Sequence, residues 1–312
     1  MAKPPRIAVV GSANTDLTTF SDNFPRPGET VFGKSFDLGF GGKGANQAIA
    51  ARLCGADVTM VAKVGNDLFG EATLKNFASF GIDTAHVGTV DGVSSGVAPI
   101  FVDSNGQNRI IVVKGANDML KPSDVEASAE VLRDVDAIVL QFEIPLETVY
   151  YAVAFARQHG IRCVVNPAPA LPANLAELTA ADYFIPNETE AEAIAGLPVH
   201  STDEAKKCAA TLLQKGFRNI ILTLGARGSL LVTAGSAEMI APFTVTAKDT
   251  TGAGDAFIGS FSVFLAEGVP EKEALSRANL YAALSTIRVG TQKSFPTRAE
   301  FEAEWTQRFG NS

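Results

Sequence analysis

Short apolar runs alternate along the chain with longer stretches in which apolar and polar residues recur at helical spacing. The apolar runs, at 7–10, 58–62, 137–140, 162–165, 183–185 and 219–222, have the length and continuity of strands buried on both faces of a parallel sheet. The helical spacing occurs at 69–80, 122–132, 146–159, 205–215 and 272–287. This alternation predicts an α/β fold in which a central, mostly parallel sheet is flanked by helices.

Other strand-like segments do not belong to that alternation. The dipeptide Asn105-Gly106 separates runs at 97–102 and 109–113 and predicts a hairpin. Residues 33–40 roughly alternate, which predicts an exposed strand. We expect parts of about 14–40 and 92–113 to form a small discontinuous β-sheet lid within a single domain spanning 1–312. Extra edge strands of the main sheet are the alternative.

Composition narrows the classes of function. The 312 residues carry a net charge of −8 without a basic cluster, so neither nucleic acid nor an anionic membrane is an expected partner. No apolar run approaches the length of a membrane span. Three scattered cysteines fit buried thiols in a reducing, cytoplasmic setting. Three histidines without metal spacing argue against a Cys–His metal site or a Ser–His–Asp enzyme.

The most informative stretch is Asp249-Thr-Thr-Gly-Ala-Gly-Asp255. Its small residues Gly252, Ala253 and Gly254 precede the apolar, helically spaced run 256–266. A helix start leaves backbone N–H groups unpaired and carries partial positive charge, so an anion can bind there. Asp255 is then either a helix cap or a general base beside the anion. Taken alone, the stretch leaves both roles open.

A second glycine-rich stretch enters the predicted helix at Lys43 and Asn46. It is not a Walker A loop, because Gly44 follows the lysine. Gly39, Gly41 and Gly44 match the dinucleotide fingerprint in form, but that fingerprint should follow the first core strand, which here lies a full segment earlier at 7–10. We therefore interpret this loop as a binding site for a polar ligand.

Polar residues follow most of the predicted core strands. In an open parallel sheet, ligands bind beyond the carboxyl ends of the strands, so these side chains are expected to share one cleft. The cleft would hold an anion site, carboxylates and amides, which suits holding a polyhydroxylated molecule and transferring a phosphoryl group. The residues are Asn14, Asp16, Glu143, Asn166, Asn187, Glu190, Thr223 and Gly225.

The motifs resemble those of the ribokinase-like carbohydrate kinases over about residues 6–300. Gly41-Gly-Lys-Gly-Ala-Asn46 and Asp249–Asp255 resemble the two family signatures, and the intervening motifs are Gly11-Ser-x-Asn-x-Asp16, Asn166-Pro-Ala-Pro169, Asn187-x-x-Glu190 and Thr223-Leu-Gly-x-x-Gly228. The resemblance implies a three-layer sandwich and ATP-dependent phosphorylation of the primary hydroxyl of D-ribose. The alternatives are phosphorylation of 2-deoxy-D-ribose or of another sugar, as in other kinases of this family. Asn14 argues against the deoxy sugar, because an amide can bond a 2-hydroxyl.

The resemblance also implies roles for individual residues. Asp255 would be the base, and Gly252, Ala253 and Gly254 would hold the γ-phosphoryl group. Sugar contacts would come from Asn14, Asp16, Gly42, Lys43, Asn46, Glu143 and Asp255. ATP contacts would come from Asn187, Thr223, Gly225, Gly228, Gly254 and Asn279. Mg²⁺ would be held through water by Asn187 and Glu190. K⁺ would be held by Asp249, Thr251, Ser285, Arg288, Gly290 and Ser294, several through backbone carbonyls. The lid would form a homodimer contact.

Overall fold

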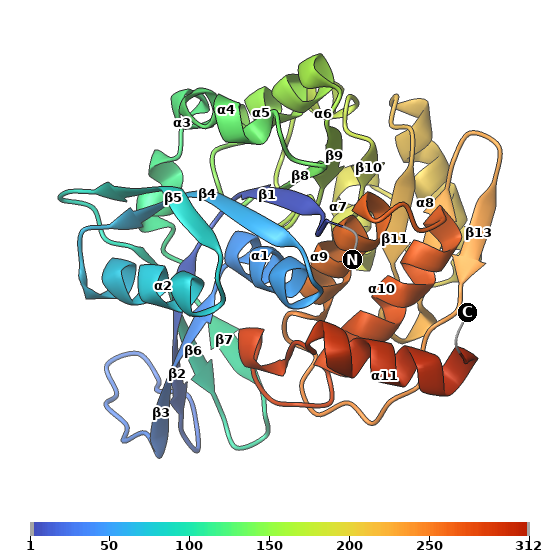
Figure 1. The fold of residues 1–312 in the computed structure, drawn as a ribbon. Coiled ribbons are helices and arrows are strands. Elements are labelled where there is room, and N and C mark those ends of the chain that lie inside the picture. Colours follow the sequence, from blue (N-terminus) through green and yellow to red (C-terminus); the bar gives the residue numbers. More distant parts are fainter. Residues whose placement is uncertain (1–2, 311–312) are drawn as a thin grey trace.

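The computed structural model describes residues 3–310. Within them, the main sheet has nine strands in the order β13-β12-β11-β10-β9-β8-β1-β4-β5 (Figure 1). Neighbouring strands from β5 to β11 are parallel, whereas β12 and β13 form an antiparallel hairpin at one edge. The strands are β1 (Arg6–Val10), β4 (Asp57–Gly65), β5 (Asp83–Val90), β8 (Ala137–Leu140), β9 (Arg162–Val165), β10 (Tyr183–Phe184), β11 (Ile220–Thr223), β12 (Ser229–Val232) and β13 (Ala237–Ile240). The predicted mostly parallel sheet is confirmed.

Helices cover both faces of this sheet (Figure 1). Alternate residues of β1 point to opposite faces, so Ile7 and Val9 join one buried cluster while Ala8 and Val10 join the other. The first cluster is completed by α1 (Lys43–Leu53), α2 (Leu68–Ser79), α9 (Ala253–Ala266), α10 (Glu271–Ser285) and α11 (Arg298–Phe309). The second is completed by α3 (Pro122–Ala127), α4 (Ala129–Leu132), α5 (Leu146–His159), α6 (Leu175–Leu178), α7 (Glu188–Ala195) and α8 (Thr202–Gln214).

A separate sheet of four strands lies at the lower left of Figure 1, in the order β3-β2-β6-β7. Its strands are β2 (Asn14–Phe20), β3 (Ser35–Gly41), β6 (Gly96–Val102) and β7 (Asn108–Ile110). We call it the small sheet. It falls within the two segments predicted for the lid, and its strands do not extend the edges of the main sheet. The alternative of extra edge strands was therefore wrong.

Some helices differ from the prediction. The single helix expected at 122–132 is two short helices that meet at Ser128, whose hydroxyl donates to the Asp124 carbonyl at 2.8 Å. Helices α7 and α11 were not predicted. No helix within residues 3–310 has the length and apolar character needed to cross a bilayer.

The strand order explains where polar residues collect. From β1 the chain passes through β4 to β5 on one side, then returns to β8 on the other side of β1 and continues to β13. Such a reversal leaves a crevice at the carboxyl ends of the two central strands. Here these are the ends of β1 and β8, which lead into residues 11–16 and 141–143.

Candidate active site

Helix α9 brings the Asp249–Asp255 stretch to the crevice. The helix begins at Ala253, three residues before the predicted apolar run, and Gly252 is its N-cap with φ 78°. A Cβ on Gly252 would lie 2.4 Å from Thr291 Cγ2, so both backbone and space require glycine there. A Cβ on Gly254 would meet nothing within 4 Å. The helix start is therefore open beside Gly254, where an anion could approach the first-turn N–H groups.

Asp255 lies in the first turn of α9 but is held by another helix. Its Oδ2 accepts a hydrogen bond from Asn46 Nδ2 at 2.9 Å, and its Oδ1 accepts one from Gln47 Nε2 at 3.0 Å. No side-chain cap is made at this end of α9. Burial raises the pKa of Asp255 above the ordinary value, while Lys43 and the two amides oppose that rise. The carboxylate is thus oriented for a task other than capping.

Lys43 stands among three carboxylates at the start of α1. Burial favours its neutral amine, but Asp255, Glu143 and Glu190 together raise the pKa of Lys43 above its ordinary value. Its backbone N–H donates to Glu143 Oε2 at 2.9 Å, and Ser12 Oγ donates to the same oxygen at 2.6 Å. The cleft therefore contains a charged ammonium group surrounded by acids.

Asn14 and Asp16 lie on one face of β2, two residues apart. They pair in register with Gly41 and Gly39 of β3, and Asn14 also pairs with Gly96 of β6, so glycines line this face of the small sheet beside them. Burial, with a smaller contribution from Glu143, raises the pKa of Asp16 to about 6. This face presents an amide and an acid at the crevice.

The structure adds amide side chains that sequence reasoning missed. Gln47 Nε2 also reaches Asn166 Oδ1 at 3.2 Å, and Gln47 Oε1 accepts from Gln141 Nε2 at 2.6 Å. The two glutamines missed by sequence reasoning are Gln47 and Gln141, because a single glutamine carries no pattern that marks a site, although Gln47 directly follows the predicted Asn46. Together these residues fix the positions of the Asp255 oxygens.

A second chain of amide hydrogen bonds reaches the site from α2. Asn76 of α2 donates to Gln292 Oε1 at 2.9 Å, Gln292 Nε2 donates to Asn46 Oδ1 at 3.0 Å, and Asn46 donates to Asp255. Gln292 lies in the turn η3 (Gln292–Ser294), within the stretch predicted to bind K⁺. The chain links that stretch to the Asp255 carboxylate.

Asn187 and Glu190 form a capping box at the start of α7. Asn187 Oδ1 accepts from the Glu190 N–H, and Glu190 Oε2 accepts from the Asn187 N–H, both at 2.8 Å. Burial raises the pKa of Glu190, with Asn187 and Lys43 opposing it. Glu190 therefore faces the same cleft as Lys43 and Asp255. One carboxylate in such a place fits Mg²⁺ that takes most of its ligands from phosphates and water.

Apart from Gly254 at the start of α9, the residues predicted to contact ATP fall into two groups. Thr223 bridges to Asn187 as β11 ends, and Gly225 begins the turn η2 (Gly225–Arg227) directly after it. Gly228 and Asn279 instead lie against residues 240–242. A Cβ on Gly228 would lie 2.2 Å from the Ile240 carbonyl oxygen, and Asn279 Nδ2 donates to the Ile240 and Ala241 carbonyls at 3.3 and 3.1 Å. Asn279 therefore ties α10 to the end of β13, and the absence of a Cβ at Gly228 lets residues 240–242 approach closely. The contact of both residues with ATP stays a prediction.

The predicted K⁺ residues lie in the loop before α9 and in the segment from the end of α10 to η3, and Asp249 joins the two. Its Oδ1 accepts from the Thr251 N–H and its Oδ2 from the Gly290 N–H, both at 2.9 Å. Burial alone would raise the pKa of Asp249, but these hydrogen bonds outweigh it and lower the pKa. The side chains of Ser285, Ser294 and Arg288 are engaged elsewhere, with Ala282, Thr291 and Glu300. Their carbonyls are the groups left to bind a cation.

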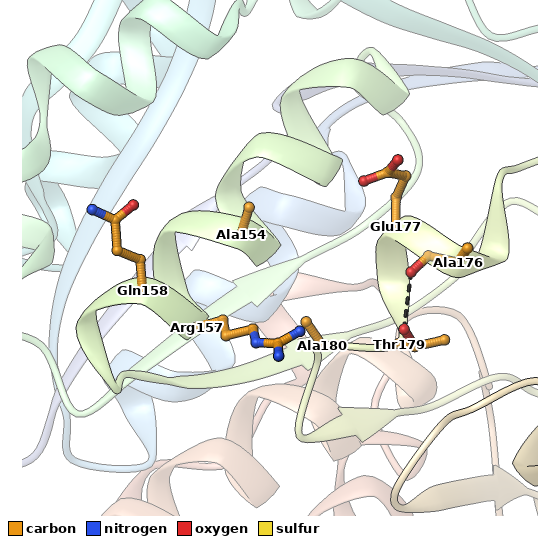
Figure 2. A pocket seen from close by; sticks show the side chains of 7 residues that line it. All are labelled: Ala154, Arg157, Gln158, Ala176, Glu177, Thr179 and Ala180. Atoms are coloured by element: carbon orange, nitrogen blue, oxygen red, sulfur yellow. Dashed lines mark hydrogen bonds between the residues drawn. The ribbon is translucent and has the colours of Figure 1, made fainter.

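Other hollows lie away from these groups. One of about 420 Å³ between α5 and α6 is lined by Ala154, Arg157, Gln158, Ala176, Glu177, Thr179 and Ala180 (Figure 2). Because α5 leads into the amino end of β9, this end of the helix lies opposite the crevice. Two others, of about 580 and 750 Å³, include Arg6 at the amino end of β1. The convergence of acids, amides and a helix start makes the crevice the candidate site.

Comparisons with known proteins identify the family of the chain. Residues 4–298 match the model of the pfkB family carbohydrate kinases. The chain is 45% identical over 296 residues to the deoxyribokinase of Salmonella typhi, covering 95% of this chain and 97% of that protein. It is 42% identical over 297 residues to the ribokinase of Bacillus subtilis, covering 95% and 98%.

A solved structure extends the likeness to three dimensions. The ribokinase of Arabidopsis thaliana, complexed with ribose and ATP, matches with a TM-score of 0.89 at 28% identity, over 96% of this chain and 98% of that one. Gly39 and Gly41 lie in β3 of the small sheet and not directly after a strand of the main sheet, which argues against the dinucleotide interpretation of the loop at 39–44. The chain belongs to the pfkB family of carbohydrate kinases.

Proposed function

We propose that the protein transfers the γ-phosphoryl group of ATP to the primary hydroxyl of D-ribose, giving ribose 5-phosphate and ADP. The observation that carries the proposal is Asp255: a buried carboxylate, aimed by Asn46 and Gln47, beside an open helix N-terminus. A base and an anion site next to each other are what in-line attack of a hydroxyl on a phosphoryl group requires.

In this mechanism Asp255 takes the proton of the primary hydroxyl as its oxygen attacks the γ-phosphorus. The bond from phosphorus to the β–γ bridging oxygen breaks, and ADP leaves. The N–H groups of Gly252 and Gly254 at the helix start stabilise charge on the transferring group. The Ala253 N–H, the third donor predicted for this anion site, donates to the Thr250 carbonyl at 3.2 Å in the structure. The raised pKa of Asp255 suits a base that must accept a proton near neutral pH.

Lys43 offsets the acidic side chains of the cleft, so that an anionic nucleotide can enter. Mg²⁺, when bound with ATP, supplies charge neutralisation at the phosphates, and Glu190 with Asn187 would hold it through water. K⁺ would lie between the loops joined by Asp249, among the carbonyls of the predicted residues. Its charge would strengthen the anion site at the adjacent helix start.

Phosphorylation of 2-deoxy-D-ribose is a second candidate, favoured by the 45% identity to a deoxyribokinase. Asn14 favours ribose, because a buried amide that bonds the 2-hydroxyl would lose its partner with the deoxy sugar. We therefore keep D-ribose as the first candidate.

We further propose that the small sheet is a lid that pairs in a homodimer. The register places Asn14 and Asp16 on one face and Leu17, Leu38 and Phe36 on the other. Leu38 and Phe36 are 40% and 60% exposed. An exposed apolar sheet face is a preferred site of association. The three free, buried cysteines fit a cytoplasmic location, where thiols stay reduced.

An ADP-release assay with a panel of pentoses tests the proposal. D-Ribose should give the highest kcat/KM, with 2-deoxy-D-ribose below it. If both sugars release ADP no faster than a reaction without sugar, the proposed function is wrong. A reversed order of the two sugars would instead favour the second candidate.

A further inference from the structure

Asn117 has a buried side chain that contacts Asn14. It is not among the residues proposed above to touch the sugar, ATP or the metal ions. It lies in the short helix η1 (Gly115–Met119), between the small sheet and α3, and is 1% exposed. Asn117 Oδ1 accepts from the Ala13 N–H at 2.9 Å, and Asn117 Nδ2 donates to the Ala13 carbonyl at 3.2 Å and to Asn14 Oδ1 at 2.8 Å.

These contacts fix which way round both amides lie. The Ala13 N–H can only donate, so the atom of Asn117 facing it must be the oxygen. The Asn117 nitrogen then faces Asn14, which must answer with its oxygen. The backbone of Ala13 therefore sets the orientation of the Asn14 amide through Asn117, and the amide with oxygen and nitrogen exchanged would not satisfy these hydrogen bonds.

The neighbouring strand is built around this pair. Gly96, at the start of β6, lies in register with Asn14, and a Cβ there would lie 2.2 Å from both Asn117 Nδ2 and Asn14 Oδ1. No larger residue leaves room for the hydrogen bond between the two amides.

The nitrogen of the Asn14 amide is left to donate to a ligand. With its oxygen used, Asn14 offers only the two N–H bonds of Nδ2, and the hydrogen bonds of residues 3–310 include none donated by that nitrogen. Asp16, on the same face of β2, offers acceptors. A hydroxyl between them can accept from Asn14 and donate to Asp16, whereas a carbon without oxygen can do neither.

We propose that Asn117 is a positioning residue for sugar specificity: it holds Asn14 as a donor toward the 2-hydroxyl of the pentose. This rests on the proposed function and deepens it. Discrimination against the deoxy sugar then depends on an orientation set outside the sugar contacts. Leaving a buried donor unpaired costs the deoxy sugar roughly ten- to hundredfold in kcat/KM.

The test is the ratio of kcat/KM for D-ribose to that for 2-deoxy-D-ribose, which does not depend on the fraction of active enzyme. Asn117→Asp keeps an acceptor for Ala13 but offers oxygen to Asn14, which then turns its nitrogen away from the sugar. At pH 8.5 the ratio should fall roughly tenfold or more. Asn117→Leu keeps the number and branching of the side-chain heavy atoms and should also lower the ratio, which gives a second measurement if the aspartate variant folds poorly. Asn105→Asp makes the same chemical change on an exposed turn and should leave the ratio unchanged.

A double-mutant cycle with Asn14→Leu identifies the route. If Asn117 acts through Asn14, the Asn117 variants should change the ratio little once Asn14 is gone. An equal fall with and without Asn14 would overturn the proposal. So would an unchanged ratio in both Asn117 variants when Asn14→Leu alone lowers it, and this result would leave the proposed function standing. An unchanged ratio in Asn14→Leu means that the 2-hydroxyl is recognised elsewhere. A wild-type enzyme inactive on both sugars overturns the proposed function itself.

Discussion

Replacing Gly254 by alanine should separate the folding role of the α9 start from its chemical role. Gly254 is exposed in the first helical turn, and a Cβ there meets nothing within 4 Å. Alanine is favoured over glycine by up to about 1 kcal/mol in a helix interior, and we expect about half of this near the end. The variant should therefore melt about 1–2 °C higher than the wild type.

The same methyl group would stand where we propose that the γ-phosphoryl group binds. Displacing a reacting group by about 1 Å costs on the order of 10²-fold in rate. We expect kcat/KM for ATP to fall by about that factor, measured by coupled ADP release, while thermal unfolding shows a protein at least as stable as the wild type.

Gly252→Ala is the matched control. This variant should melt lower for two reasons. The φ of 78° at this position is left-handed, which costs about 1–2 kcal/mol for residues other than glycine, and the added Cβ would lie only 2.4 Å from Thr291 Cγ2. A fully active Gly254→Ala enzyme would refute the position proposed for the phosphoryl group. An enzyme that loses activity together with stability would mean that Gly254 serves the fold.

Four further predictions follow from the site. Asp255→Asn should lower kcat by roughly 10²–10⁴ in a folded protein, and full activity would remove Asp255 as the base. Replacing K⁺ by Na⁺ should lower kcat in the wild type but make no difference in Asp249→Ala; indifference of the wild type argues against the cation loop. Because the pKa of Asp16 is raised to about 6, kcat/KM for the sugar should fall as the pH drops through 6 and Asp16 gains a proton; the same acid limb in Asp16→Asn would assign it to another group. Gln292→Leu cuts the amide chain to Asn46 and should lower kcat about tenfold with a smaller change in KM; a change in KM alone would contradict a link to Asp255.

The parts of the fold that could be predicted are those with strong local patterns. Helix α5 and strand β9 have the predicted bounds, 146–159 and 162–165, because an amphipathic helix, a left-handed Gly160 and a continuous apolar run follow one another. Helix α7 was missed because its first residues are polar and read as the end of a strand. Helix α11 buries only Phe301 and Trp305 deeply, which leaves a weak apolar pattern.

The candidate site was predictable where its residues stand in glycine-rich motifs or directly after core strands, and not where amides from distant segments support it. Asp255 stands in a motif that indicates an anion site, and Lys43 stands in one that indicates a binding site for a polar ligand. Gln292 reaches Asn46 across 246 positions of sequence, and Asn117 reaches Asn14 across 103. Such contacts arise from the packing of distant elements, and nothing local in the sequence marks them.

The most direct test of the central claim uses a sugar without the attacked hydroxyl. ADP release should be compared for D-ribose and 5-deoxy-D-ribose, in the wild type and in Asp255→Asn. The account predicts one ADP per phosphorylated ribose and no release above the sugar-free rate with 5-deoxy-D-ribose. With D-ribose, Asp255→Asn should release ADP roughly 10²–10⁴ times more slowly than the wild type. Equal turnover of the two sugars would contradict transfer to the primary hydroxyl.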